Sequence, residues 1–226
     1  MLRNRIARLG VAVATAALMV PALASTATAA PAYPKVPSVA AVAKVYPHLA
    51  GGTATETATK VYGPGKKCGQ TKVIKGASGR TASYAPDYSS GDPDAYLMTG
   101  ERPSVSVQAF KFPTAKAAIA YLRGYAKQTK HCPGTKPGGG GGGTGGQPHC
   151  TSKTKKIAFK LGNERWGYQI RSTCTIDDQT TSSVFNSLFA RKGRSIVYTS
   201  AMSMDATAPS IPKSITFTGI ALKTAG

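Results

Sequence analysis

Acidic residues are scarce in this sequence: Asp and Glu number 9 among 226 residues, against 29 Lys and Arg, so the formal net charge is +20. Catalytic motifs are also lacking, because no G-x-S-x-G nucleophile elbow, no H-E-x-x-H zinc motif and no motif with paired carboxylates occurs. We therefore predict a protein that is not an enzyme and needs no cofactor. The positive charge favours anionic surroundings, such as wall polymers, lipid headgroups or nucleic acid, or serves solubility alone.

Hydrophobic runs are scarce as well, and the one of any length lies near the N-terminus. Three arginines precede an uncharged apolar run over 9–24, and Ala27-Thr28-Ala29 supplies the small residues of a cleavage site. This run is shorter than the roughly 20 apolar residues that span a bilayer, and no second run of spanning length follows. We predict a signal peptide over 1–29 and a mature chain that is secreted or associated with the cell wall, without a transmembrane segment.

The rest of the chain is long enough for one domain with a buried core, which we place at 38–226. The proline-rich stretch 30–37 is predicted to be a flexible leader. Inside the domain, the segment PGGGGGGTGGQP at 137–148 has almost no side chain to bury. It also lacks the preceding strand and the following Lys-Ser or Lys-Thr of a phosphate-binding loop. We predict a disordered surface linker there.

Hydrophobic spacing predicts a mixture of strands and helices. A period of two predicts strands over 71–74, 81–84, 96–98, 104–112, 157–161, 165–173 and 195–202. A helical period predicts a short helix from 38 to about 47 and longer helices over 115–130 and 179–192. The Thr- and Gly-rich stretch 51–65 is expected to be a loop, and 209–222 fits a helix or a strand.

Two of the predicted strands carry more detail. In SVSVQAFKF the apolar side chains change sides between Ala109 and Phe110, which indicates a bulge or a strand buried on both faces near its end. In RWGYQIRST, even spacing puts four side chains on one side: Trp166, Tyr168, Ile170 and Ser172. The preceding Gly162-Asn163 is typical of a turn, so we predict a hairpin of 157–161 with 165–173 that covers the core.

The helix predicted over 115–130 carries a stripe of cations, namely Lys116, Arg123, Lys127 and Lys130. These residues either face an anion or form an ordinary solvated helix face, and the charge pattern favours the second interpretation. Tyr121 and Tyr125 lie four residues apart on the same helix. Interleaved aromatics and cations can stack with nucleic-acid bases, but these tyrosines fit the core face equally well, where we expect them.

Histidine and cysteine form two adjacent pairs, His131-Cys132 and His149-Cys150, which could together bind zinc. The spacing inside each pair is shorter than structural zinc sites favour. A cluster of Asp87, Asp92 and Asp94 lacks the Gly-centred loop and terminal Glu of a calcium site. We therefore predict no metal site. Because an even number of cysteines in an exported chain usually means disulfides, we expect all four to be oxidised: Cys68, Cys132, Cys150 and Cys174.

The order of the parts resembles a known family. A cysteine in KKCGQ precedes the strand SVSVQAFKF and the helix TAKAAIAYLRGYAKQTKHCPG, and then come ERWGYQIRSTC and FARKGRSIVYTSA. This order is similar to that of the PknH-like extracellular sensor domains of actinobacteria, which occur on receptor Ser/Thr kinases and as stand-alone exported proteins. The resemblance covers about 38–201 and rests on element order and cysteine placement.

The resemblance implies an α+β fold, with helices packed on an antiparallel β-sheet, two disulfides, a ligand cleft and no catalytic activity. Residue by residue, it implies the pairs Cys68–Cys132 and Cys150–Cys174. The competing pair Cys132–Cys150 would only close the glycine linker. Unlike the receptor members, this chain has no kinase domain and no membrane anchor.

Three hypotheses for function follow. The first is a secreted, sensor-like binding domain that takes an unknown small ligand or envelope component. The second is a cationic envelope protein that binds anionic wall polymers through charge alone, and the third is a secreted hydrolase with an unrecognised site. Charge-only binding weakens steeply with salt, whereas a ligand held in a pocket does not, so a salt titration separates the first two.

Overall fold

A computed structural model describes residues 32–65, 70–131, 149–176 and 179–226. Several predictions concern residues outside these ranges: the signal peptide, the glycine linker over 137–148, and the cysteines Cys68 and Cys132 with their proposed disulfide. The described residues belong to one compact unit, Pro31–Gly226. No helix within the described residues is long and apolar enough to cross a membrane.

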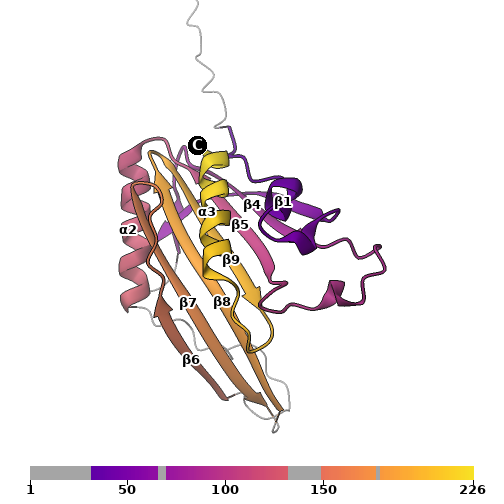
Figure 1. Ribbon diagram of the computed structural model, residues 1–226. Coiled ribbons are helices and arrows are strands. Elements are labelled where there is room, and N and C mark those ends of the chain that lie inside the picture. The colour runs from indigo at the N-terminus through magenta and orange to yellow at the C-terminus, as the bar shows by residue number, and fades with distance from the viewer. Residues whose placement is uncertain (1–31, 66–69, 132–148, 177–178) are drawn as a thin grey trace, which may run out of the picture. The chain divides into compact units, whose positions relative to one another are not determined.

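Seven strands form one sheet, in the order β1-β4-β5-β9-β8-β7-β6 (Figure 1). Their bounds are β1 Thr53–Thr59, β4 Ser78–Ala85, β5 Ser104–Lys111, β9 Ser195–Ser203, β8 Gln179–Lys192, β7 Glu164–Ile176 and β6 His149–Lys156. All neighbouring strands are antiparallel. Strands β2 (Tyr62–Pro64) and β3 (Gln70–Val73) form a separate two-stranded sheet. The predicted antiparallel sheet is therefore confirmed.

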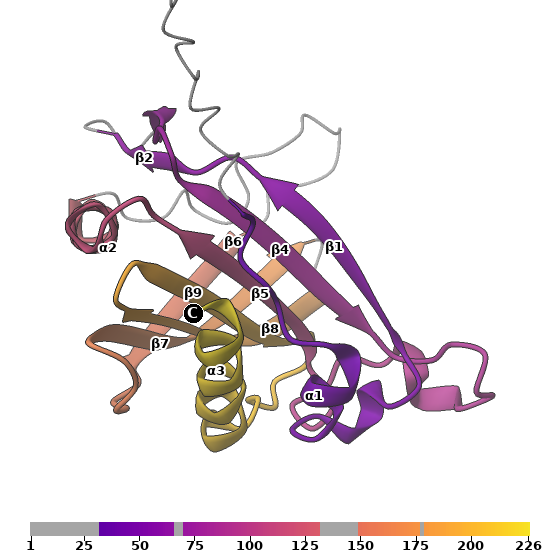
Figure 2. The same cartoon turned by 90° about the horizontal axis from the view of Figure 1, so that it is seen from above.

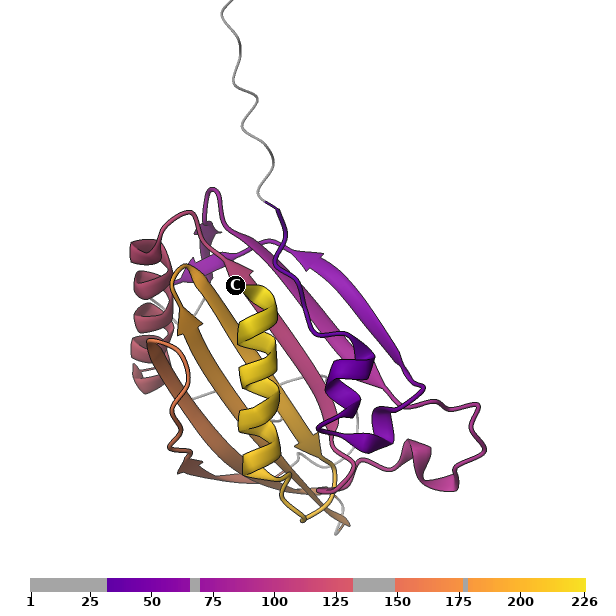
Figure 3. The ribbon, with the colours of Figure 1, turned by 45° about the horizontal axis from the view of Figure 1, so that its top comes forward.

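Helices pack on both faces of the large antiparallel sheet, so the fold is α+β. Helices α1 (Val39–Ala43) and α3 (Ile211–Ala225) lie on one face, with α3 over β8 and β9 (Figures 2 and 3). Helix α2 (Ala115–His131) lies on the other face, beside β2. We call these the α3 face and the α2 face. Two short 3-10 helices, η1 (Pro47–Leu49) and η2 (Pro93–Tyr96), complete the described elements.

The α3 face holds the larger part of the core. Alternate residues of the central strands point to it, namely Val105, Val107, Ala109, Val197 and Ala201, and they pack against Phe217, Ala221 and Leu222 of α3. Phe217 is fully buried, and burial of such a side chain contributes roughly 1.5–3 kcal/mol. The Ser210 hydroxyl caps α3 by accepting a hydrogen bond from the Lys213 amide, so the ambiguous stretch 209–222 is a helix.

Part of the stretch expected to be a flexible leader is packed onto this core. Val36 is buried with the α3-face cluster. The Tyr84 hydroxyl donates a hydrogen bond of 2.7 Å to the Pro37 carbonyl, and the Ser78 hydroxyl donates one of 3.3 Å to the Ala32 carbonyl. The prediction for 30–37 is thus corrected over its described residues, because valine burial and two hydrogen bonds hold a segment that has no helix or strand of its own.

The helix predicted over 179–192 is wrong, because this segment is β8, paired with β7 on one side and β9 on the other. Val184 and Leu188 point to the α3 face, whereas Phe185 and Phe189 point to the α2 face. A strand buried on both faces can show the same spacing as the apolar side of a helix. Gly193, which follows β8, makes the tight turn from β8 to β9 with a φ of 57°.

Other corrections concern polar or short segments. The stretch 51–65, expected to be a loop, contains β1 and β2, and the partner of β7 in its hairpin is β6 rather than 157–161. Both β1 (TATETAT) and β6 (HCTSKTKK) are edge strands of the sheet without large apolar residues, so they show no hydrophobic alternation. The strand expected over 96–98 is absent, since η2 ends at Tyr96 and irregular chain follows.

Most of the remaining elements follow the predictions. The strands over 71–74, 81–84, 104–112 and 195–202 correspond to β3, β4, β5 and β9, and the helices over 38–47 and 115–130 to α1 and α2. Strand β5 keeps a continuous register with both neighbours, so the change of sides at Ala109 and Phe110 marks burial on both faces rather than a bulge.

Candidate functional site

Residues that are far apart in the sequence form one row across the α2 face. Each member lies directly opposite the next in the strand register: Thr57, Thr81, Gln108, Tyr198, Phe189 and Trp166, from β1, β4, β5, β9, β8 and β7. We call this the aromatic row. Its side chains change from small and polar at β1 to large and aromatic at β7.

The aromatic end of this row is a continuous stack of rings. Trp166 lies on Phe189 with 3.7 Å between ring centroids, and Phe189 lies beside Tyr198 at 4.3 Å. The Tyr198 and Ser187 hydroxyls form a hydrogen bond of 3.2 Å, which fixes the orientation of the tyrosine. Stacked rings of this kind present a flat apolar surface that needs little reordering when a ligand binds.

Helix α2 lies beside this stack and contributes two tyrosines to the same cavity. The Tyr121 ring packs against Phe112 at 4.9 Å and against Tyr125 at 4.7 Å between centroids. The Tyr125 hydroxyl donates a hydrogen bond of 3.1 Å to the Tyr62 carbonyl of β2. Gly124 lets α2 approach β2 closely, because a Cβ there would lie 2.5 Å from the Pro64 ring. The helix is therefore held at the side of the row by its own aromatic residues.

A cavity of about 330 Å³ lies between α2, the segment that joins β1 to β2, and the aromatic row. It is lined by Thr59, Lys60, Val61, Tyr62, Thr81, Gln108, Phe110, Tyr121, Tyr125, Phe189 and Tyr198. This lining contains six aromatic rings and no Asp, Glu, His or Cys. Its single charged residue, Lys60, is exposed. The size and the aromatic lining are those of a site for a small molecule.

Several polar groups in this lining could form hydrogen bonds with a ligand. Within the described residues, the Thr59 hydroxyl is buried without a hydrogen-bond partner. The Gln108 side-chain amide lines the same cavity. Burial raises the pKa of the Tyr121 hydroxyl well above its ordinary value, and the neighbouring Tyr125 raises it further. The tyrosine therefore stays neutral across the physiological range. Such groups can recognise an uncharged polar ligand.

Sequence patterns found only part of this site. They singled out Tyr121, Tyr125 and Trp166, although as core residues, and they missed Gln108 and Tyr198. The signal for the missed residues is strand parity: both lie on the side of their strands opposite the strictly apolar positions. Parity alone does not show that β5 and β9 are neighbours.

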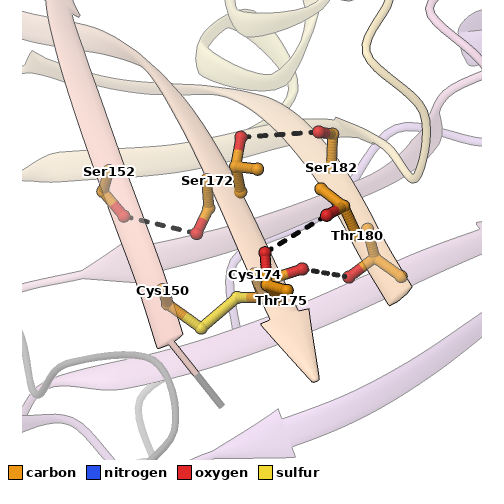
Figure 4. The surroundings of a disulfide bond; sticks show 9 residues. Cys150, Ser152, Ser172, Cys174, Thr175, Thr180 and Ser182 are labelled. Carbon is orange, nitrogen blue, oxygen red and sulfur yellow. Dashed lines mark hydrogen bonds between the residues drawn. A yellow bond between two sulfur atoms is a disulfide. The ribbon is translucent and has the colours of Figure 1, made fainter. Parts of the chain in front are cut away.

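The two described cysteines lie outside this site. Cys150 and Cys174 are directly opposite each other on β6 and β7 and form a disulfide, with 4.1 Å between their Cα atoms (Figure 4). Hydroxyl pairs surround the bond, among them Ser152 with Ser172 at 3.3 Å and Thr175 with Thr180 at 3.2 Å. This disulfide joins two strands at the edge of the sheet and is no part of the cavity lining. Because Cys150 is bonded to Cys174, it is not available as a zinc ligand.

One residue of the predicted cationic stripe of α2, Arg123, pairs with a carboxylate of the protein itself. Arg123 donates hydrogen bonds to the Glu164 carboxylate, which also accepts one from Arg191. Partial burial tends to raise the pKa of Glu164, but Arg123 and Arg191 outweigh this effect and hold the pKa below its ordinary value. Lys116 and Lys127 are exposed on the same helix. The side chain of Lys130 lies outside the described residues.

No group of three or more His, Cys, Asp or Glu in the described part of the chain is placed to hold a metal ion. The carboxylates of the 87–94 turn act as turn caps instead. Asp87 accepts hydrogen bonds from the Ser89 amide and hydroxyl, and Asp92 accepts from the Asp94 amide and from Arg102. These hydrogen bonds lower the pKa of both carboxyls.

A second, more open hollow of about 750 Å³ lies at the start of α3. It contains His48, Arg102 and Lys213, together with Glu101. Arg102 forms an ion pair with Asp92 at 2.6 Å. Burial lowers the pKa of His48, which keeps its ring neutral near pH 7. Because the two cations are offset by two carboxylates, this hollow is a weaker candidate than the aromatic cavity.

Comparisons with known proteins give one structural likeness. No protein-family profile and no curated protein matches the chain. In its backbone, the chain is similar to the crystal structure of the extracellular domain of PknH from Mycobacterium tuberculosis, with a TM-score of 0.43 and 10% sequence identity. The match covers 83% of this chain and 91% of that one. The family that the sequence resembles is named after PknH.

Proposed function

We propose that the mature chain is an exported, non-enzymatic binding domain that holds a small ligand in the cavity beneath α2. One observation carries this proposal: the cavity combines six aromatic rings with the unpaired Thr59 hydroxyl and the Gln108 amide. Aromatic surfaces supply affinity through buried apolar area, and a few placed polar groups supply specificity. The site is already formed, so little binding energy is lost to ordering.

The composition of the cavity also argues for binding rather than catalysis. General acid–base chemistry needs a group whose pKa lies near the working pH, and nucleophilic chemistry needs an activated Ser, Cys or Lys. The described lining has no carboxylate, imidazole or thiol, and the pKa of Tyr121 is raised away from neutrality. The sequence resemblance extends this proposal to a sensor-like role, in which another protein would read the bound state.

Nuclear magnetic resonance with a library of neutral fragments tests the site. Fragments that bind should shift the amide signals of Gln108, Tyr121 and Tyr198. A Thr81→Tyr variant should abolish these shifts, because its ring would fill the cavity from β4. Thr151→Tyr is a matched control, since Thr151 is exposed on edge strand β6 and points to the opposite face. Fragment binding that Thr81→Tyr leaves unchanged would refute the cavity as the site.

Export is a separate part of the proposal, and N-terminal sequencing of the secreted protein tests it. Culture supernatant should contain a chain that begins at or near Ala30, because the stretch over 1–29 has the charge and apolar pattern of a signal peptide. Recovery of only full-length, cell-bound protein would contradict this expectation.

A further inference from the structure

A second row of side chains, next to the aromatic row, consists of hydroxyl groups. It runs through Thr55, Ser83, Ser106, Ser200 and Ser187, each directly opposite the next on β1, β4, β5, β9 and β8. We call it the hydroxyl row. Each member lies two residues along its strand from a member of the aromatic row, so both rows share the α2 face.

The hydroxyls of this row are largely unused inside the protein. Ser187 is bonded to Tyr198, whereas Thr55, Ser83, Ser106 and Ser200 make no side-chain hydrogen bond within the described residues. Thr55 and Ser83 are exposed, and Ser106 and Ser200 are half-buried. Because neighbouring strands lie about 4.8 Å apart, the row offers hydroxyl groups at a regular spacing.

Neither row contains Asp, Glu, Lys or Arg, although the chain carries a net charge of +20. Glu56 on β1 and Arg80 on β4 fall on the alternate positions, which point to the other face. Glu56 and Arg80 form an ion pair there at 2.8 Å. Glu164 of β7 and Arg191 of β8 do lie on the α2 face, next to the aromatic row, but they form an ion pair with each other. The two rows themselves therefore offer no cation to a polyanion.

We propose that the two rows together bind a neutral carbohydrate chain. One sugar ring would lie in the cavity against Tyr198, and the following rings would cross the hydroxyl row. Sugar hydroxyls both donate and accept hydrogen bonds. The Ser and Thr hydroxyls and the Gln108 side-chain amide also do both, so they can pair with them. The C–H face of a sugar ring suits the flat faces of Tyr198 and Phe189, and one ring is about as long as the strand spacing.

This inference rests on the proposed function, because the cavity is one end of the same surface. Its test starts from an array of neutral gluco-, galacto-, manno-, arabino- and N-acetylglucosamine oligosaccharides, with oligogalacturonate as an anionic probe. The best-binding tetrasaccharide is then titrated while the fluorescence of Trp166 is followed. Trp166 is the only tryptophan of the chain and stacks on Phe189 of the cavity lining, so its emission should change on binding.

The expected affinity for the neutral tetrasaccharide changes less than about twofold between ~0.05 and ~0.5 M salt, because no charge is involved. The double variant Ser106→Ala/Ser200→Ala should weaken binding about tenfold, through loss of two hydrogen-bonding hydroxyls. Thr151→Ala/Thr180→Ala is the matched control, with two exposed hydroxyls of the same sheet that point to the other face, and it should bind like the wild type. Thr55→Val, on an exposed edge strand, repeats the test in a variant that keeps its shape, with an expected loss of about threefold.

Three outcomes would overturn the carbohydrate proposal. The first is an array without neutral binders while fragments still bind in the cavity, which would leave the proposed function standing. The second is oligosaccharide binding that Ser106→Ala/Ser200→Ala and Thr55→Val do not weaken. The third is tighter, salt-sensitive binding of oligogalacturonate, which would indicate recognition by charge. Loss of fragment binding as well as sugar binding would instead count against the cavity itself.

Discussion

Arg123 of α2 and Glu164 of β7 form an ion pair that fastens the helix to the sheet, with 3.1 Å between the Arg123 Nε and Glu164 Oε1 atoms. Glu164 also accepts a hydrogen bond from Arg191, with 3.3 Å between the Arg191 Nε and Glu164 Oε2 atoms. The Arg191 side chain is 7% exposed. One carboxylate therefore serves an exposed and a buried guanidinium. Arg123, a residue of the cationic stripe for which an anion-facing role was the alternative interpretation, thus finds its anion within the protein.

Replacing Glu164 by Gln should destabilise the protein at neutral pH by about 1–2 kcal/mol, because Arg191 would stay buried with a neutral partner. The pKa of Glu164 is lowered in the folded protein, so its contribution is complete above the unfolded pKa. It is lost as the pH falls through the lower, folded value. Urea unfolding at a series of pH values measures this: the two stability curves should converge in acid. A difference that persists unchanged in acid would contradict the assignment.

Removal of the disulfide by Cys150→Ser/Cys174→Ser should lower the free energy of unfolding by about 3 kcal/mol in the chain-entropy model, for a loop with a sequence separation of 24. Fragment binding in the cavity should persist, because the bond lies at the edge of the sheet. Guanidinium unfolding measures the change, and reduction of the wild type is the control. Non-reducing peptide mapping also tests the predicted Cys68–Cys132 bond, which a Cys132–Cys150 peptide would refute.

His48 should make stability fall as the pH drops below the ordinary histidine pKa of about 6.5. Burial lowers its pKa, the hydrogen bond between its Nε2 atom and the Pro103 carbonyl partly opposes this, and Arg102 and Lys213 lower it further. A lowered folded pKa means that stability is complete above the unfolded pKa and is lost as the pH falls. His48→Gln, which can still donate a hydrogen bond to Pro103, should therefore flatten the fall in Tm on acidification. An equally steep fall in the variant would show that another group is responsible.

Asn186 should be among the polar residues whose loss costs most stability. It is fully buried, donates hydrogen bonds of 3.0 Å to the Pro209 carbonyl and the Ser214 hydroxyl, and accepts one of 3.0 Å from Gln169. Asn186→Val should cost about 2–3 kcal/mol, because it leaves buried polar partners unpaired between β8 and α3. A double-mutant cycle with Ser214→Ala isolates the pair, and additive effects would show that it is not coupled.

The elements predicted correctly are those whose local pattern agrees with their place in the fold. The apolar alternation of SVSVQAFKF and SIVYTSAM belongs to central strands, and the apolar stripe of 115–130 belongs to a helix with one buried face. Segment 179–192 was predicted wrongly because a strand buried on both faces resembles a helix in its apolar spacing. Edge strands β1 and β6 were missed because their side chains are mostly polar and exposed to solvent. Their sequences therefore show no alternation of apolar and polar residues.

The chemical character of the protein can be read from its sequence alone: the strong positive charge, the export pattern, the even number of cysteines and the lack of catalytic motifs are all local or compositional properties. The candidate site is different, because it exists only through strand order. Gln108 and Tyr198 become neighbours when β5 pairs with β9, and Phe189 joins them when β8 pairs with β9. Long-range pairing of this kind depends on the free energy of the whole core, so only the tertiary structure decides which side chains share the α2 face.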